Sequence, residues 1–332
     1  MPLTLLVPDL LVAADAPDAL RTLRLPRLET WLARADGQRV PAGRSGWLFG
    51  QWGLGAQAPV AALTLAADGG PREGTWMRAD PVHQRVERHA LVLHDGGTLA
   101  LSADEVREAV AALNAFFARD GLEFAAPTRE RWYVRLPEGE APRTVPFEEA
   151  VGRNPFGMIP QGGVRLSWPS IFSEAQMLLA ALPLNAAREA DGRPALNGLW
   201  FWGAGTFPAR LACPYRAIAA ADPLARGLAL ASGADLRALP GDPSELASWG
   251  GGPGLVVLDA LGAPLRQGDF SGWRAAAERL DRQWFRCLGD LLAAHRHLRL
   301  VLPGDRETAV FDLAPGARWR LLRRARPLAS HA

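Results

Sequence analysis

The stretch Asn197-Gly198-Leu199-Trp200-Phe201-Trp202-Gly203-Ala204-Gly205 decides how the fold of this chain is interpreted. Its aromatic and apolar run predicts a buried strand that leads into a loop with two glycines. Glycines let backbone amides come close to a ligand, and ligands bind beyond the carboxyl ends of strands in an open α/β sheet. Trp200 and Trp202 lie two positions apart, so they project from the same face of a strand. The alternative is that both tryptophans pack in the core and the glycines form a tight turn.

The composition is that of a soluble globular protein with one large or two ordinary domains. The chain has 332 residues, of which 48% are hydrophobic and 22% are charged, and its net charge is +2. That charge does not indicate a nucleic-acid-binding surface. The apolar start lacks the basic region of a signal peptide, no stretch is long enough for a membrane span, and Cys213 and Cys287 form no spaced motif. We therefore expect a cytoplasmic protein without a nucleic-acid or membrane partner.

All 37 basic residues counted as Lys or Arg are arginine, because the sequence contains no lysine. This excludes Schiff-base catalysis and the lysine of a phosphate-binding P-loop. Arginine remains well suited to bidentate binding of phosphate or carboxylate.

The order of expected elements predicts an α/β fold with an inserted α+β domain. Residues 1–71 and 193–325 are expected to form a parallel-sheet core with flanking helices, and residues 72–192 the smaller inserted domain. Core strands are expected at 3–8, 197–203, 216–219, 254–258, 298–302 and 309–313. Core helices are expected at 25–35, from Asp222-Pro223 to Gly233, and at 273–294. Residues 42–55 are expected to be a glycine-rich loop, and the arginine-rich tail from Arg318 to be solvated.

Within the insertion, short strands are expected in 75–101, with a hairpin turn at 95–97, and at 122–124 and 132–136. Ser102 and Ser173 each begin a capping box, which predicts helices to about Arg119 and about Glu189, with an interruption at Pro183. Residues 137–163 are expected to be a long surface loop.

The segment from Arg78 to Arg85 combines Arg78, Asp80, His83 and Arg85 within eight residues. Such a set could bind an anionic ligand or perform acid–base chemistry. The alternative is a solvated turn, which Asp80-Pro81 favours. A three-histidine metal site with His89 and His94 is not expected, because these two histidines point to opposite sides of one strand.

Asn185 and Arg188 are three positions apart, so they share one face of their expected helix. Arg188 could satisfy the last carbonyls of the helix, or it could point at a ligand held between the two domains. Three common signatures are absent from the sequence: the dinucleotide-binding glycine pattern, the nucleophile elbow and the helical zinc motif His-Glu-x-x-His.

With these residues laid out, the chain resembles the cofactor-independent phosphoglycerate mutases, particularly the archaeal-type branch, within the alkaline phosphatase superfamily. The resemblance is carried by Asn197–Gly205, by Asn185-x-x-Arg188, by 217–227 and by Asp9 after the first strand. Similar bacterial proteins carry names such as phosphoglycerate mutase or pathogenicity-factor regulatory protein. The resemblance implies a phosphatase-like α/β core with an inserted substrate domain. The candidate ligand-binding residues are Arg78, Asp80, His83, Arg85, Asn185 and Arg188 in the expected insertion and Trp202, Gly203 and Gly205 in the expected core.

The family transfers a phosphoryl group through a serine with two divalent metals held by Asp and His. Here the resemblance implies Ser45 as the nucleophile and Asp9, Asp259 and Asp305 as remnants of the metal ligands. The sequence departs from the family pattern because no His follows Asp259 before Trp273 and because Arg306 follows Asp305. An arginine cannot be deprotonated, so it places a fixed positive charge where a metal would lie.

Two hypotheses follow, and a third stays open. The first is a pseudoenzyme without a cofactor that binds a small phosphorylated or carboxylated ligand in a regulatory role. The second is an active phosphoglycerate mutase (an isomerase) or phosphatase with a rearranged site, Ser45 as nucleophile and Mn²⁺ or Mg²⁺ as cofactor. The third is an interaction module that binds a protein partner or forms a homodimer, for which some of the twelve tryptophans would form an exposed patch.

Overall fold

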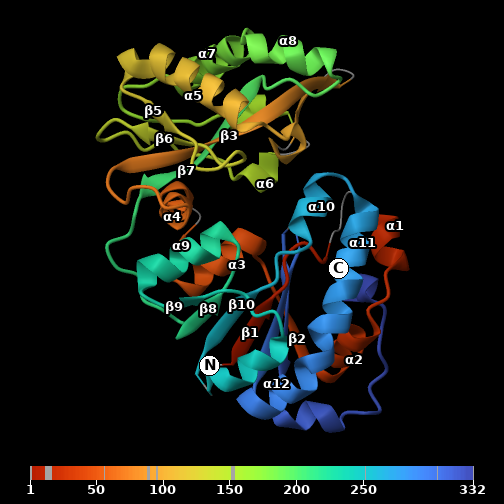
Figure 1. Ribbon diagram of the computed structural model, residues 1–332. Coiled ribbons are helices and arrows are strands. Elements are labelled where there is room, and N and C mark those ends of the chain that lie inside the picture. The colour runs from red at the N-terminus through yellow and green to blue at the C-terminus, as the bar shows by residue number, and fades with distance from the viewer. Residues whose placement is uncertain are drawn as a thin grey trace. The chain divides into compact units, whose positions relative to one another are not determined.

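The structure, a computed structural model, describes residues 2–11, 17–55, 57–87, 90–94, 96–150, 154–250, 252–304 and 306–331. The chain divides into two compact units, the first made of Met1–Ala56 and Arg210–Ala332 and the second of Gln57–Ala209. Both ends of the chain thus form one unit and the middle forms the other (Figure 1). The second unit extends beyond the expected limits 72–192 on both sides, because helix α4 and the tryptophan strand pack within it.

The first unit is built on a seven-stranded sheet in the order β2-β12-β11-β1-β10-β8-β9. The strands β11, β1, β10, β8 and β9 are parallel neighbours, while β12 and β2 add antiparallel strands at one edge. The bounds of the strands are β1 Leu3–Leu6, β2 Asp36–Val40, β8 Ala217–Ala219, β9 Asp235–Arg237, β10 Gly254–Val257, β11 Leu298–Pro303 and β12 Thr308–Leu313. The predicted α/β fold with a mostly parallel sheet is confirmed.

Helices cover both faces of this sheet, as its unbroken apolar strands require. A single buried core joins β1, β10, β11 and β12 to α2, α11 and α12 on one face, while α9 lies on the other (Figure 1). The helices of this unit are α1 Pro17–Thr22, α2 Pro26–Arg34, α3 Arg44–Gln51, α9 Pro223–Ser232, α10 Gly262–Arg266, α11 Phe270–Gln283 and α12 Leu288–His295.

Two expectations for the first unit were wrong. The glycine-rich stretch forms helix α3, since Trp47, Leu48 and Phe49 are all buried, and their burial outweighs the low helix propensity of the glycines. The long helix expected at 273–294 is divided, because α11 ends at Gln283 and a short 3₁₀ turn, Phe285–Cys287, separates it from α12.

The second unit is built on a five-stranded antiparallel sheet. Its central strand β3 pairs with β7 along one side and with β6 and then β4 along the other. The strands are β3 Thr75–Glu87, β4 Ala90–His94, β5 Glu123–Ala125, β6 Tyr133–Leu136 and β7 Gly198–Thr206. The helices are α4 Val60–Ala67, α5 Ala103–Phe117, α6 Phe147–Ala150, α7 Trp168–Ala180 and α8 Pro183–Ala190.

The strand β7 is the tryptophan strand, and its expected place in the parallel core was wrong. It runs antiparallel to β3, with Leu199 opposite Pro81 and Trp202 opposite Arg78. Trp200 is fully buried against Phe172 of α7, with ring centroids 6.4 Å apart. Helix α4 packs on the sheet through Ala61 and Leu65. The tryptophans therefore form core contacts, as the alternative interpretation held, but Gly203 and Gly205 lie within β7, so the expected glycine loop or turn was wrong.

The two capping boxes gave different outcomes. Ser102 and Glu105 make both reciprocal bonds at the start of α5, as predicted. The helix with Ser173 instead begins at Trp168, so Ser173 lies inside α7 and its hydroxyl bonds back to the carbonyl of Pro169. Pro183 does end this helix, since α8 begins at that residue. The expected hairpin turn at Asp95 lies partly outside the described residues, and Gly96–Leu99 form a 3₁₀ turn.

Candidate functional site

Three aspartates follow neighbouring parallel strands of the first sheet. Asp9 follows β1, Asp222 follows β8, and Asp259 follows β10, which lies between the other two. The carboxyl ends of parallel strands meet at one edge of the sheet, which is where α/β proteins place their ligand sites. The predicted residues Asp9 and Asp259 thus belong to one edge, and the structure adds Asp222.

Arg44 joins two of these aspartates. It is the first residue of α3, and its Nη1 lies 3.6 Å from Asp9 Oδ2, while its Nη2 lies 2.5 Å from Asp222 Oδ2. Asp222 is held from its other oxygen, because Oδ1 accepts a 2.8 Å bond from the amide of Ala225 and so caps α9. The arginine thereby occupies a fixed position between two carboxylates from different strands.

Asp9 has an unusual backbone conformation. Its φ of 62° lies in the left-handed region, which costs a non-glycine residue free energy and occurs frequently at functional sites. The indole Nε1 of Trp273 donates a 2.8 Å hydrogen bond to the Asp9 carbonyl and helps to hold this turn.

Gly262 leaves room for charged groups beside Asp9. A Cβ atom at this position would lie 2.8 Å from Asp9 Oδ2 and 2.9 Å from Arg266 Nη1. Both distances are too short for real contacts, so a side chain here would displace the carboxylate or the guanidinium. The edge thus contains three carboxylates together with the guanidinium groups of Arg44 and Arg266.

The pKa of Asp259 is raised above its usual value. Burial is the largest cause, the negative charge of Asp222 adds to it, and Arg44 and Arg266 act in the opposite direction. The neutral form of Asp259 is therefore more favoured in the folded protein than in the unfolded chain.

We expect the replacement Asp259→Asn to stabilise the first unit at neutral pH. A carboxyl whose pKa is raised by folding contributes most stability below its unfolded pKa of about 3.9 and loses that contribution as pH rises through the folded pKa. The gain from asparagine should therefore be present at pH 7 and vanish at about pH 3.5. Thermal unfolding of the full chain at both pH values measures it, with the exposed Asp235→Asn as control. Equal gains at both pH values would contradict the assignment.

The residues at this edge do not fit the two-metal centre of the phosphatase superfamily. Asp9 and Asp222 are both engaged by Arg44, whose guanidinium stays charged and would repel a cation. Within the described ranges, no group of three His, Cys, Asp or Glu side chains is placed to hold a metal ion. Asp305, the third predicted remnant, lies outside the described residues.

Ser45, the predicted nucleophile, is the second residue of α3 and follows Arg44 directly. It is partly exposed and lies in the first helical turn, where backbone amides lack intrahelical partners. The structure therefore places Ser45 next in sequence to the arginine that binds Asp9 and Asp222.

In the second unit, Arg78 and Asp80 form a buried pair. Arg78 Nε and Nη2 lie 3.0 and 2.5 Å from Asp80 Oδ1, and Trp202 Nε1 donates a 2.7 Å bond to Asp80 Oδ2. The guanidinium lies over the rings of Tyr133 and Trp202, at 5.3 and 5.4 Å from their centroids. Burial raises the pKa of Asp80, and the charge of Arg78 opposes this rise. Arg78, Asp80 and Trp202, which were predicted to bind a ligand, are therefore hydrogen-bonded to one another.

His83 and Arg85 lie further along β3 and do not join this pair. His83 Nδ1 is 2.8 Å from the carbonyl oxygen of Ala195, and Arg85 is exposed opposite Val92 of β4. The alternative of a solvated turn at Asp80-Pro81 was wrong, because both residues lie within the thirteen-residue strand β3. His89, which entered the rejected metal site, lies outside the described residues.

Gly203 and Gly205 of the tryptophan strand make room for the start of α4. A Cβ atom on Gly203 would lie 2.8 Å from the Cβ of Val60, and one on Gly205 would lie 2.5 Å from the Cβ of Pro59. The amide of Gly203 donates to the hydroxyl of Thr144 at 2.9 Å. The close approach that these glycines permit is therefore to protein backbone and side chains of the same unit.

Asn185 and Arg188 lie on one face of α8, as predicted, but both are buried. Asn185 bonds to the backbone of Leu179 and Leu196. Arg188 is 0% exposed, and its three nitrogens bond to the Pro194 carbonyl, the Glu105 carboxylate and the Leu99 carbonyl. This geometry favours the structural alternative, in which both side chains hold segments of the second unit together.

Sequence reasoning missed Arg44, Asp222 and Arg266. Asp222 was recognised only as a helix cap, although its position directly after a parallel strand is the signal that placed Asp9 and Asp259. Arg44 was missed because residues 42–55 were expected to form a loop, whereas Arg44 begins helix α3. Of the twelve tryptophans, nine are buried, two are half-buried and only Trp319 is exposed, so they form no tryptophan patch.

The sequence is similar, at low identity, to that of a phosphoglycerate mutase. It is 23% identical over 214 residues to a probable 2,3-bisphosphoglycerate-independent phosphoglycerate mutase from Geobacter sulfurreducens. The match covers 62% of this chain and 53% of the relative, so the chain spans about half the length of the curated relative it matches. No protein-family model matches the chain. The match supports the resemblance that was drawn from the sequence.

Two solved structures are similar to the chain. The structure of PH0037 protein from Pyrococcus horikoshii has a TM-score of 0.56 and 15% identity, and the match covers 99% of this chain and 92% of that chain. A cofactor-independent phosphoglycerate mutase from Thermoplasma acidophilum has a TM-score of 0.45 and 15% identity, with 99% of this chain and 94% of that chain covered. The similarity to PH0037 protein shows a shared fold. In the described part of the chain, no helix has the length and apolar character needed to cross a membrane.

Proposed function

We propose that this phosphoglycerate-mutase-like protein is a pseudoenzyme that binds a small phosphorylated or carboxylated ligand in a regulatory role. The observation that carries the proposal is the position of Arg44, whose guanidinium engages Asp9 and Asp222 at the sheet edge. In a two-metal enzyme of this superfamily, carboxylates at this edge would bind cations. Here a side chain of the protein supplies the positive charge.

Two guanidinium groups at the edge could bind an anionic ligand. Arg44 and Arg266 both act on Asp259 and oppose the rise of its pKa. Guanidinium groups bind phosphate and carboxylate through paired, charge-assisted hydrogen bonds. A ligand phosphate would compete with Asp222 for Arg44. It could also contact the guanidinium of Arg266, which lies near Asp9.

The purified full chain with and without Mn²⁺ tests the proposal. We expect no phosphoglycerate mutase turnover in either condition, and calorimetry in the presence of a chelator should show binding of phosphoglycerate. Arg44→Gln should weaken this binding about tenfold, since it removes a charge-assisted contact. Arg107→Gln, at an exposed position of α5, is the control. Robust Mn²⁺-dependent turnover would contradict the proposal.

An active mutase or phosphatase with a rearranged site is the second candidate. It is favoured by Ser45, which lies in the first turn of α3 directly after Arg44. In this case turnover should depend on Mn²⁺ or Mg²⁺ and should be abolished by Ser45→Ala. If Ser45→Ala leaves all measured turnover unchanged, this candidate fails.

A further inference from the structure

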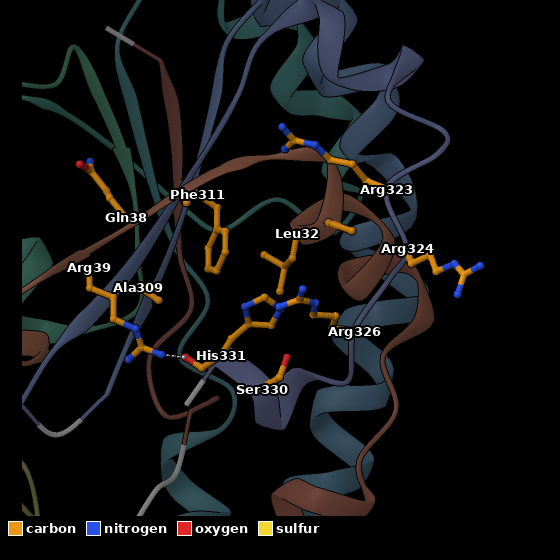
Figure 2. Close-up of a pocket in the computed structure, with 12 residues that line it drawn as sticks. Leu32, Gln38, Arg39, Ala309, Phe311, Arg323, Arg324, Arg326, Ser330 and His331 are labelled. Carbon is orange, nitrogen blue, oxygen red and sulfur yellow. Dashed lines mark hydrogen bonds between the residues drawn. The ribbon is translucent and has the colours of Figure 1, made fainter.

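A basic pocket lies in the first unit at the edge of the sheet formed by β2 and β12. Its volume is about 690 Å³, and it is bounded by these strands, by α2 and by the segment from Arg323 to His331 (Figure 2). Its lining shares no residue with the edge formed by Asp9, Asp222 and Asp259. It is therefore a separate site in the same unit.

The segment from Arg318 is exposed at nearly every position up to Pro327, as expected, but it is anchored to the first unit and forms one wall of this pocket. Arg320 forms a two-point ion pair with Asp36, at 2.6 and 3.0 Å, and Arg323 donates to the carbonyl of Ala35 at 2.9 Å. Leu328 is fully buried, and its amide donates to Glu29 Oε1 at 3.0 Å. A wall held at both ends can present its side chains in a defined arrangement.

The floor of the pocket is apolar. Leu32, Ala309 and Phe311 line it and are buried in the main core. The imidazole of His331 lies edge-on to the ring of Phe311, with centroids 5.3 Å apart (Figure 2). A planar or apolar group could pack on this surface.

The polar lining carries an excess of positive charge. It contains Arg39, Arg323, Arg324, Arg326 and His331, and none of the lining residues is acidic. Arg39 bonds to the His331 carbonyl at 2.9 Å and to Glu307 at 3.3 Å, and Arg323 pairs with Asp36 at 3.5 Å. Among the described residues, no carboxylate forms an ion pair with Arg324 or Arg326.

His331 is partly buried among positive charges of the pocket. Burial lowers the pKa of His331, and the charges of Arg326 and Arg39 lower it further, while Glu29 acts in the opposite direction. Figure 2 places the Arg326 guanidinium beside the His331 ring, with the Leu32 side chain above the ring in this view. The charges of Arg326 and Arg39 thus disfavour the protonated form of His331, and an anion bound among these groups would favour it.

We propose that this pocket binds a phosphate monoester attached to an apolar body. Arginine forks match the oxygens of a phosphate, and the Phe311 and Leu32 surface would receive the apolar part. The volume suits a small molecule of this kind. The same chemistry is present in a soluble phosphate ester and in the head group of phosphatidic acid, so the test separates the two.

Calorimetry on the full chain with naphthyl phosphate, naphthol and inorganic phosphate tests the proposal. Naphthyl phosphate should bind more tightly than either fragment, because it uses both the arginines and the apolar floor. Arg326→Gln should weaken its binding about tenfold through the loss of a charge-assisted contact. Ser330→Glu, which adds a negative charge to the exposed rim, should weaken it at least as much. Both positions are exposed, so both variants should fold, and circular dichroism checks this.

One control variant makes the result specific, because Arg282→Gln, at an exposed position of α11, should leave the affinity unchanged. Arg266→Gln shows whether naphthyl phosphate binds at the aspartate edge instead. Cosedimentation with phosphatidylcholine vesicles that contain phosphatidic acid, abolished by Arg326→Gln, would assign the ligand as a lipid head group. Absence of binding to both naphthyl phosphate and the vesicles would overturn the proposal. Binding of naphthyl phosphate that only Arg266→Gln weakens would also overturn it. Failure of phosphoglycerate binding at Arg44 would leave this result unaffected.

Discussion

Replacing Arg78 by methionine is expected to destabilise the second unit by about 3–5 kcal/mol, because it leaves Asp80 buried without its charge partner. Asp80 Oδ1 would lose both guanidinium bonds, while the carboxylate would keep the bond from Trp202 to Oδ2 and its interaction with the Trp132 backbone. Hydrogen exchange of peptides from β3 and β7 in the full chain would measure the local loss.

The pH dependence of this variant has a defined sign. Burial already raises the pKa of Asp80, and removing Arg78 takes away the charge that opposes this rise. The destabilisation should therefore be large at pH 8 and decrease in acid, where Asp80 becomes protonated. Adding Asp80→Asn to Arg78→Met should recover much of the stability at pH 8.

A matched control for Arg78 lies in the same sheet. Arg135 on β6 is exposed and lies 3.5 Å from Glu123, so Arg135→Met should cost about 0.2–1 kcal/mol. If Arg78→Met costs no more than Arg135→Met, the buried pair is not holding this sheet together, and its groups would be available for a ligand.

Elements with strong local signals could be predicted from the sequence. The reciprocal bonds of Ser102 and Glu105 start α5, and Asp222, Pro223 and Gly233 set both ends of α9. These signals depend on residues within a few positions of one another, so the sequence contains them completely.

The pairing of the tryptophan strand could not be predicted in this way. An apolar strand shows the same local pattern in a parallel core sheet and beside β3, whose paired residues lie more than a hundred positions earlier. Ser173 shows a related limit, because a capping box can form only at the first residues of a helix. Helix α7 begins earlier, at Trp168, where Trp168 and Phe172 are buried.

The same limit of local sequence patterns explains why only part of the candidate site was predicted. Asp9 and Asp259 were found because a carboxylate after a parallel strand has a defined place at the sheet edge. Arg44 was not found, because its partner Asp222 is 178 positions away and the glycine-rich sequence around it hid a helix. The chemistry of the edge changes with this one residue, since it supplies a positive charge among the carboxylates.

Replacing Gly203 by alanine is expected to destabilise the second unit by about 2–5 kcal/mol. The left-handed φ of 66° costs an L-residue about 1–2 kcal/mol. The added Cβ would also lie 2.8 Å from the Cβ of Val60, and overpacking of this kind costs about 1–3 kcal/mol. Hydrogen exchange should report the loss in β7 and at the start of α4, because the helix must move away from the strand.

Gly192 separates the two contributions. Its φ of 68° is nearly the same as that of Gly203, but no atom lies within 4 Å of the position that its Cβ would take. Gly192→Ala should therefore cost only the backbone contribution of about 1–2 kcal/mol and leave the exchange of α4 unchanged. If both variants lose the same stability, Gly203 is required only for its backbone angle. The close packing of α4 on the tryptophan strand would then not explain why glycine follows Trp202.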